Sequence, residues 1–399
     1  MQRKRDFLLR ASGLVLLTLL ASAVLPSSCR RPSILQQPPA DRHVPFNYVG
    51  RHGMIVAAHP LAVDAGLEML KRGGNAIDAA VATTFALNAA EPFASGIGGG
   101  GFMVIYLARS RKVTVINYRE KAPQGAWPTM FSEKGEEEDL WRTATGLAVA
   151  VPGAPAGWDL ALRRYGTRSL EEAAKRAIEI AEQGFPVSRT FSSINKDEYE
   201  RLALNLGEKS WYLKEGFPFE PGEHYRNPDL ARTFRRLAER GAEEFYRGEL
   251  ARKIVEAVRA RQGVMTLEDL AAYRAEEVAP LRGTYKDFSL FTAPPPASGG
   301  LHLIQLLNIA ENWPLREWGH NAPRYIHHLS EALRFVFADR ERYLGDPDFV
   351  SVPVEGLLSK NHAAAIASRI LPGRPIDSYP HGAFEKNTDM QGNTTHLCV

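Results

Sequence analysis

The sequence contains very few cysteines and no excess of charge. Cys29 and Cys398 are its two cysteines, near opposite ends of 399 residues, which excludes a framework of several disulfides and a cysteine-based metal site. The formal net charge is +3, and residues 1–28 alone carry all of it. The rest of the chain is therefore neutral overall, and nothing indicates a surface for nucleic acid.

Long apolar runs are also missing, except near the N-terminus. Residues 11–25 are almost entirely apolar and follow a segment with four basic side chains, a layout that predicts an export signal over residues 1–29. The protein would then be periplasmic or extracellular. Two small residues precede Cys29, so a lipid anchor on Cys29 and simple cleavage nearby both stay open, as do the Sec and twin-arginine routes. The proline-rich residues 30–50 are predicted to form a linker.

The remaining sequence predicts a mixed α/β fold with helices in the majority. Helices are expected over 60–71, 75–90, which begins at Asn75, and 170–183, which begins with a capping box at Ser169. A hairpin is expected from 102–107 and 112–118. Further elements are expected as helices over 229–260 (interrupted near Gly241), 301–311 (capped by Ser298) and 324–343, a strand over 288–292, and a strand-like ending at 397–399.

Two motifs invite a ligand-site interpretation that their context disfavours. The glycine run at 96–101 follows a helix and enters a strand, the reverse of the order in nucleotide-binding loops. It predicts a tight, close-packed turn, and a supporting role near a site stays open. His327, His328 and Glu331 share a helical face but lack a further metal ligand. We interpret them as a polar helix face and expect neither a metal nor a cofactor.

Thr394 and Arg119 are the candidate site residues. A threonine released at a new N-terminus by backbone cleavage can attack a carbonyl, because its own α-amino group serves as the base. The Thr394-Thr395-His396 segment would suit such a cut, although Thr pairs are also common in strands. Arg119 ends the predicted hairpin and could clamp a carboxylate with two parallel hydrogen bonds. The alternative for Arg119 is a surface ion pair with Glu120.

Characteristic segments follow one another from about residue 50 to the end of the chain. They are the sequences at 53–62, 73–80, 91–92 with the glycine run, 117–123, 151–153, 184–188, 245–248, 266–270, 294–300, 338–340, 343–347 and 394–396. Taken together and in this order, they resemble the γ-glutamyltransferase (glutathione hydrolase) family.

The resemblance implies an N-terminal-nucleophile hydrolase fold, a four-layer αββα sandwich that is incomplete in this chain. The precursor would cut itself between Asn393 and Thr394. Residues 51–393 would form the large subunit, and 394–399 would begin the small subunit. Thr394 would be the nucleophile, Thr395 would support its hydroxyl, and Arg119 would bind the α-carboxylate of the substrate.

The implied substrate is glutathione or a related γ-glutamyl compound, with water, an amino acid or a peptide as acceptor. The small subunit from the same precursor would be the protein partner, and we expect this chain to be a truncated precursor that is inactive alone. Two alternatives stay open: a non-catalytic exported protein that binds γ-glutamyl compounds, and a related acylase that acts on cephalosporins or poly-γ-glutamate.

Overall fold

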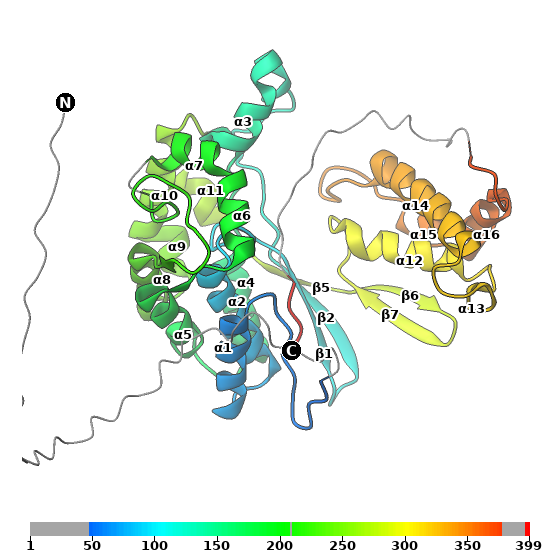
Figure 1. Ribbon diagram of the computed structural model, residues 1–399, viewed down its shortest axis with the longest axis horizontal. Coiled ribbons are helices and arrows are strands. Elements are labelled where there is room, and N and C mark those ends of the chain that lie inside the picture. The colour runs from blue at the N-terminus through cyan, green and yellow to red at the C-terminus, as the bar shows by residue number, and fades with distance from the viewer. Residues whose placement is uncertain (1–47, 208–209, 377–395) are drawn as a thin grey trace, which may run out of the picture. The chain divides into compact units, whose positions relative to one another are not determined.

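The computed structural model describes residues 48–207, 210–376 and 396–399 (Figure 1). All of them belong to one structural unit, Gln37–Val399. The predicted export signal, most of the predicted linker and the predicted cleavage junction at Asn393, Thr394 and Thr395 lie outside the described residues, so the predicted domain boundaries stay predictions.

Four helices form the first part of the core: α1 (Pro60–Lys71), α2 (Ala76–Ala90), α5 (Leu170–Gln183) and α8 (Pro228–Arg240). They pack in succession, α1 on α2, α2 on α5 and α5 on α8. Helix α2 is buried on nearly every face because its alanines let neighbouring helices approach closely. Asn75 caps this helix, as predicted, and forms a full capping box: Asn75 Oδ1 accepts from the Asp78 N–H, and Asp78 Oδ2 accepts from the Asn75 N–H at 2.7 Å.

A three-stranded antiparallel sheet joins β1 (Phe102–Leu107), β2 (Lys112–Asn117) and β5 (Glu276–Val278) in the order β1-β2-β5. The predicted hairpin is therefore confirmed, with Phe102 opposite Asn117. On one face Ile105 and Ile116 pack against α4 (Ala154–Tyr165) through Ala161. On the other face of β1, Val104 and Tyr106 are 46% and 63% exposed. The second face is therefore open along β1 but closed at Val115 of β2, which is fully buried opposite Val104, and the end of β2 leads to Arg119.

A second group of elements contains the hairpin of β6 (Leu281–Tyr285) and β7 (Phe288–Thr292) with helices α12 (Ser298–Ala310), α14 (Pro323–Tyr343) and α16 (Lys360–Arg369) (Figure 1). Ile309, Phe335 and Ile366 bring the three helices into one apolar core. The predicted strand over 288–292 and both predicted helices are confirmed. The prediction for Ser298 was wrong in one respect: it is the first residue of α12, and no side chain caps that helix.

The predicted helical stretch over 229–260 is divided at Gly241, as expected, and again at Gly248, which gives α8, α9 (Glu243–Arg247) and α10 (Glu249–Ala260). The other elements are short: the 3₁₀ helices η1 (Ser132–Glu137) and η2 (Gly146–Ala148), the pair of β3 (Phe185–Pro186) and β4 (His224–Tyr225), and helices α3 (Glu138–Ala144), α6 (Arg189–Asp197), α7 (Tyr199–Leu206), α11 (Leu267–Ala272), α13 (Leu315–Trp318) and α15 (Val354–Leu357). None of the helices in the described part of the chain has the length and apolarity to cross a membrane. The predicted mixed α/β class is confirmed.

The last four residues return to the beginning of the described chain. Val56 and Cys398 form an antiparallel bridge with two backbone hydrogen bonds of 2.9 Å each. The strand-like character predicted for the ending is consistent with this pairing. The segment that directly follows the predicted junction is therefore held next to the chain that enters α1.

Candidate functional site

Arg119 lines an open pocket with a cavity volume of about 150 Å³. Four stretches of the chain form its walls: the end of β2 with the residues after it, the residues from Tyr273 to Val278, the Pro295-Pro296 pair, and the turn at 346–348. The pocket is lined by more charged than apolar side chains. Such a lining suits a small polar ligand.

The main chain of Arg119 is fixed by hydrogen bonds, whereas its side chain is largely free. The Arg119 N–H donates to Asn117 Oδ1 at 3.0 Å. The guanidinium side chain is 59% exposed, and its one ion pair is with Glu120, Nε to Oε2, at 3.5 Å. That distance is beyond a good charge-assisted hydrogen bond. Within the described part of the chain the guanidinium makes no other hydrogen bond or ion pair, so its fork of N–H groups remains available to a ligand.

The predicted alternative for Arg119, a surface pair with Glu120, is thus present but only as a long contact. Lys121 has an equally long contact, Nζ to Asp348 Oδ2 at 3.5 Å, but its ammonium group has three N–H donors, whereas a guanidinium has five. The Arg274 guanidinium already donates to the carbonyl oxygens of Ala271 and Tyr273 at 2.7 and 2.6 Å. Arg119 is therefore the cation of this pocket with the most unused hydrogen-bonding capacity.

The glycine run forms a tight turn against the end of β2, which confirms its prediction. Gly101 and Tyr118 exchange two backbone hydrogen bonds of 3.2 and 2.9 Å, and the carbonyl of Gly99 accepts from the N–H groups of Gly153 and Ala154, both at 2.9 Å. A Cβ at Gly100 would lie 2.3 Å from the Tyr118 carbonyl oxygen. Only glycine allows so close an approach, and the turn thereby fixes the residue that precedes Arg119.

Tyr118 directly precedes Arg119 and is half-buried. Burial, together with the nearby Glu120 carboxylate, raises the pKa of Tyr118 to about 12. A Cβ at Gly157 would lie 2.2 Å from the Tyr118 ring, so the ring fits closely against α4. Tyr118 is therefore a neutral, packed support at neutral pH and supplies no charge to the site.

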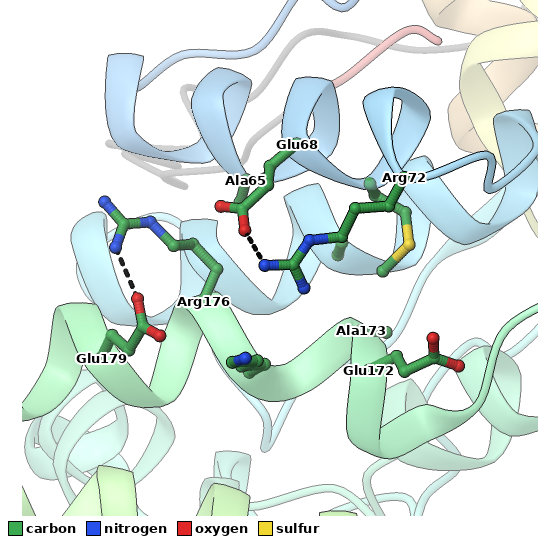
Figure 2. A pocket seen from close by; sticks show the side chains of 10 residues that line it. Ala65, Glu68, Arg72, Glu172, Ala173, Arg176 and Glu179 are labelled. Atoms are coloured by element: carbon green, nitrogen blue, oxygen red, sulfur yellow. Dashed lines mark hydrogen bonds and ion pairs between the residues drawn. The ribbon is translucent and has the colours of Figure 1, made fainter. Parts of the chain in front are cut away.

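A second pocket lies between α1, α2 and α5, and its cavity volume is only about 10 Å³. Figure 2 shows its two ion pairs, Glu68 with Arg72 on α1 and Arg176 with Glu179 on α5, the latter at 2.6 Å. A cavity of this size has room for roughly one water molecule. It cannot hold a substrate, and the Arg119 pocket is the candidate functional site.

The two adjacent histidines of α14 each have a ring nitrogen within hydrogen-bond distance of a backbone carbonyl oxygen. His328 is buried against Trp313 and Trp318, and its Nδ1 lies 2.8 Å from the Arg324 carbonyl oxygen. Burial lowers the pKa of His328. His327 Nε2 lies 2.9 Å from a carbonyl oxygen, that of Leu371. His328 and Glu331 are buried rather than part of an exposed polar face, and no group of His, Cys, Asp or Glu side chains suited to a metal occurs among the described residues.

Of the predicted site residues, the structure describes Arg119. Asn393, Thr394 and Thr395 lie outside the described residues, which resume at His396. Nothing in the local sequence singles out Tyr273, whose hydroxyl donates to the Arg119 carbonyl oxygen at 2.8 Å. The capping box formed by Thr266 and Asp269 was the available signal that a short helix begins at Leu267, and this helix ends just before Tyr273.

Comparison with known proteins points to one family. A family model described as gamma-glutamyltranspeptidase matches residues 62–399. A glutathione hydrolase proenzyme of Pseudomonas sp. (strain A14) is 40% identical over 80% of this chain, which spans 56% of the length of that relative. The crystal structure of Helicobacter pylori gamma-glutamyltranspeptidase matches with a TM-score of 0.80 and 36% identity, over 86% of this chain and 100% of the matched one. A cephalosporin acylase from Bacillus halodurans matches with a TM-score of 0.71 and 31% identity, over 84% of this chain and 63% of the other.

Proposed function

The chain belongs to the gamma-glutamyltranspeptidase family, and from this premise we propose that it forms part of an enzyme that transfers or hydrolyses the γ-glutamyl group of glutathione and related compounds. Family membership and the N-terminal-nucleophile hydrolase fold were both predicted from the sequence, and both predictions are confirmed. The chain spans 56% of the length of its Pseudomonas relative. The activity is therefore proposed for a protein that also contains a segment equivalent to the other part of that relative.

The observation that carries the proposal is the state of Arg119. Its main chain is held, its side chain opens into a pocket of about 150 Å³, and its one ion pair is 3.5 Å long. A guanidinium presented in this way matches the two oxygens of an α-carboxylate. We assign Arg119 to the α-carboxylate of the γ-glutamyl group, a fixed anchor that leaves the γ-carbonyl free to approach a nucleophile.

Thr394 is proposed as that nucleophile, after cleavage of the Asn393–Thr394 bond. The liberated α-amino group accepts the hydroxyl proton as Oγ attacks the γ-carbonyl carbon, and then delivers it to the leaving amine. The product is a γ-glutamyl ester of Thr394. Thr395 is proposed to support the Thr394 hydroxyl by a hydrogen bond.

Water completes hydrolysis by attacking this ester, and an amino acid or peptide completes transfer. The proposed protein partner is the small subunit that begins at Thr394 and comes from the same precursor. Export by the segment 1–29 is proposed to deliver the protein to the periplasm or the outside of the cell, with lipidation of Cys29 or simple cleavage as the two outcomes.

The likeness to a cephalosporin acylase favours a second candidate function, hydrolysis of an amide other than a γ-glutamyl amide by the same Thr394. Competition between substrates distinguishes the two. A γ-glutamyl anilide should be turned over and inhibited by glutathione if the first proposal is right, whereas a preference for a cephalosporin side chain supports the acylase. A non-catalytic binding protein would remain uncut and would turn over neither.

The experiment that tests the proposal uses a precursor that joins this chain to the second half found in its relatives. Thr394→Ala should leave one uncut band on a denaturing gel and abolish turnover of a γ-glutamyl anilide. Thr388→Ala, which changes a nearby threonine, is the matched control and should be cut and active. Two bands from Thr394→Ala would remove Thr394 from the nucleophile role.

A further inference from the structure

The carbonyl group of Arg119 is held by a single side chain from a distant part of the sequence. Tyr273, at the C-terminal end of α11, donates its hydroxyl to the Arg119 carbonyl oxygen at 2.8 Å. Tyr273 is 6% exposed. This hydrogen bond acts on the same residue whose N–H is held by Asn117, so both polar groups of the Arg119 main chain have partners.

The position of the Tyr273 hydroxyl is itself fixed. Its ring stacks on that of Tyr246, with centroids 5.6 Å apart and planes 9° apart. The Tyr246 hydroxyl in turn donates to the Pro152 carbonyl oxygen at 2.9 Å and accepts from the Ala156 N–H at 3.2 Å. Burial and the nearby carboxylates of Glu120 and Glu276 raise the pKa of Tyr273, so its hydroxyl keeps the proton that it donates.

Helix α11 holds the segment after Arg119 at a second point. Asp269 Oδ1 accepts from the Gln124 N–H at 2.9 Å, while Asp269 Oδ2 accepts from the Thr266 N–H at 2.8 Å in the capping box of the same helix. One short helix therefore contacts both ends of the stretch from Arg119 to Gln124.

The other side of this stretch is closed by the residues that lead into α4. Lys121 and Val151 exchange backbone hydrogen bonds of 3.3 and 2.8 Å. A Cβ at Gly153 would lie 2.0 Å from the Tyr118 carbonyl oxygen and 2.2 Å from the Tyr273 hydroxyl. The packing therefore leaves little room for the main chain at Tyr118 to move toward Gly153, and the Tyr273 hydroxyl holds the next carbonyl, that of Arg119.

We propose that Tyr273 is a positioning residue, whose hydroxyl fixes the Arg119 carbonyl and through it the origin and direction of the guanidinium. A bidentate contact with a carboxylate requires the planar fork to be aligned, and a fixed main chain limits the positions that the flexible side chain can reach. The expected effect of Tyr273 on substrate binding rests on the proposed carboxylate-binding role of Arg119. The effect of Tyr273 on the Arg119 main chain does not depend on that role, and it can be measured separately.

The direct test is backbone amide hydrogen exchange on the full chain with Tyr273→Phe, which removes one hydroxyl and keeps the stacked ring. Loss of one neutral hydrogen bond should raise exchange at the hydrogen-bonded amides of Arg119 and Lys121 by about threefold to tenfold. The control is Tyr225→Phe, another buried tyrosine outside this site, which should leave these two amides unchanged. Equal exchange at these amides in Tyr273→Phe and the wild-type chain would overturn the proposal.

Kinetics on the cleaved enzyme supply the second readout. Tyr273→Phe should raise KM for a γ-glutamyl anilide by about threefold to tenfold while kcat stays unchanged, because a bond that orients the anchor affects ground state and transition state alike. A fall in kcat with unchanged KM would contradict the positioning role. Arg119→Lys separates the two proposals: if that variant keeps a normal KM, the carboxylate-binding role fails, whereas the exchange result judges Tyr273 in either case.

Discussion

The Arg119 pocket and the small pocket between α1, α2 and α5 are both lined by arginines and carboxylates, yet the arginines have different partners. In the pocket of Figure 2, Arg72 and Arg176 each pair with a glutamate about one turn away on the same helix. Arg119 follows the end of a strand, and its one ion pair is a long contact with the adjacent residue. Arg72 and Arg176 are each held by a charge partner one helical turn away, whereas Arg119 is fixed through its main chain and its guanidinium remains available to a ligand.

The two pockets also differ in size and in the interactions that fix the backbone around them. The α1–α5 pocket has space for about one water molecule, and the helices on both sides are held by apolar packing. Around Arg119, the main chain is fixed by tight contacts with glycines and by hydrogen bonds to its N–H and carbonyl groups. Both surroundings immobilise the backbone, so the larger cavity and the free guanidinium, more than the presence of charge, distinguish the candidate site.

The largest effect is expected from breaking that immobilisation. Gly153→Ala should lower the free energy of unfolding by roughly 4 kcal/mol, above the usual range for overpacking, because its Cβ would meet a backbone carbonyl and a buried hydroxyl that are both held. Gly98→Ala, where a Cβ meets nothing within 4 Å, should change stability by less than about 0.5 kcal/mol. Chemical denaturation of both variants checks this, and equal stabilities would show that the Gly153 contact is not restrictive.

The next largest effect is a pH-dependent loss of stability at the start of α1, one of the helices that form the small pocket. Burial lowers the pKa of His59, the residue that caps α1, from 6.5 to about 4. Between these pH values the unfolded chain binds the proton and the folded chain does not, so stability is complete above pH 6.5 and falls as the pH drops toward 4. The loss should be about 3 kcal/mol. His59→Asn, which keeps a capping side chain, should remove this pH dependence, and an unchanged slope in urea unfolding would assign it to other groups.

A smaller effect is expected at the fork of Arg119. In the cleaved enzyme, Arg119→Lys should raise KM for a γ-glutamyl substrate roughly tenfold to hundredfold, because a point charge replaces two parallel charge-assisted hydrogen bonds. Arg72→Lys, at an exposed helical pair, is the matched control and should leave KM unchanged. Steady-state kinetics measure both. A normal KM in Arg119→Lys would return Arg119 to the role of a surface ion pair.

The smallest effect should come from the helical pairs. Glu68→Gln removes the charge partner of Arg72 at a site where both side chains are about half exposed. Such pairs contribute about 0.3 to 0.5 kcal/mol, so the change in unfolding free energy should stay within that range and shrink further in high salt. A decrease of more than about 1 kcal/mol in the free energy of unfolding would show that these pairs contribute substantially to stability.

Local signals in the sequence predicted much of the fold correctly. The capping arrangements at Asn75 and Ser169 predicted where α2 and α5 begin, and two β-rich segments separated by a short polar turn predicted the hairpin of β1 and β2. The start of α12 was misplaced because Ser298 follows a run of prolines and resembles a cap, whereas Ala297 occupies the capping position. Such errors of a few residues arise where several signals compete within one turn.

The candidate site was predictable only in part. Arg119 could be selected from its place at a strand end and from the resemblance, but its partners lie far away in the sequence. Neither the bond from Tyr273 to the Arg119 carbonyl nor the contact between Lys121 and Asp348 leaves a local pattern. They depend on tertiary packing. Only the structure could therefore show that the Arg119 main chain is fixed while its guanidinium is not.

The most direct test of the account is a crystal structure of the cleaved enzyme with bound L-glutamate. The account predicts that both oxygens of the α-carboxylate lie about 3 Å from the nitrogens of the Arg119 fork, with the Tyr273 hydroxyl still on the Arg119 carbonyl. A glutamate held by Lys121 or Arg274, with Arg119 still directed at Glu120, would contradict it.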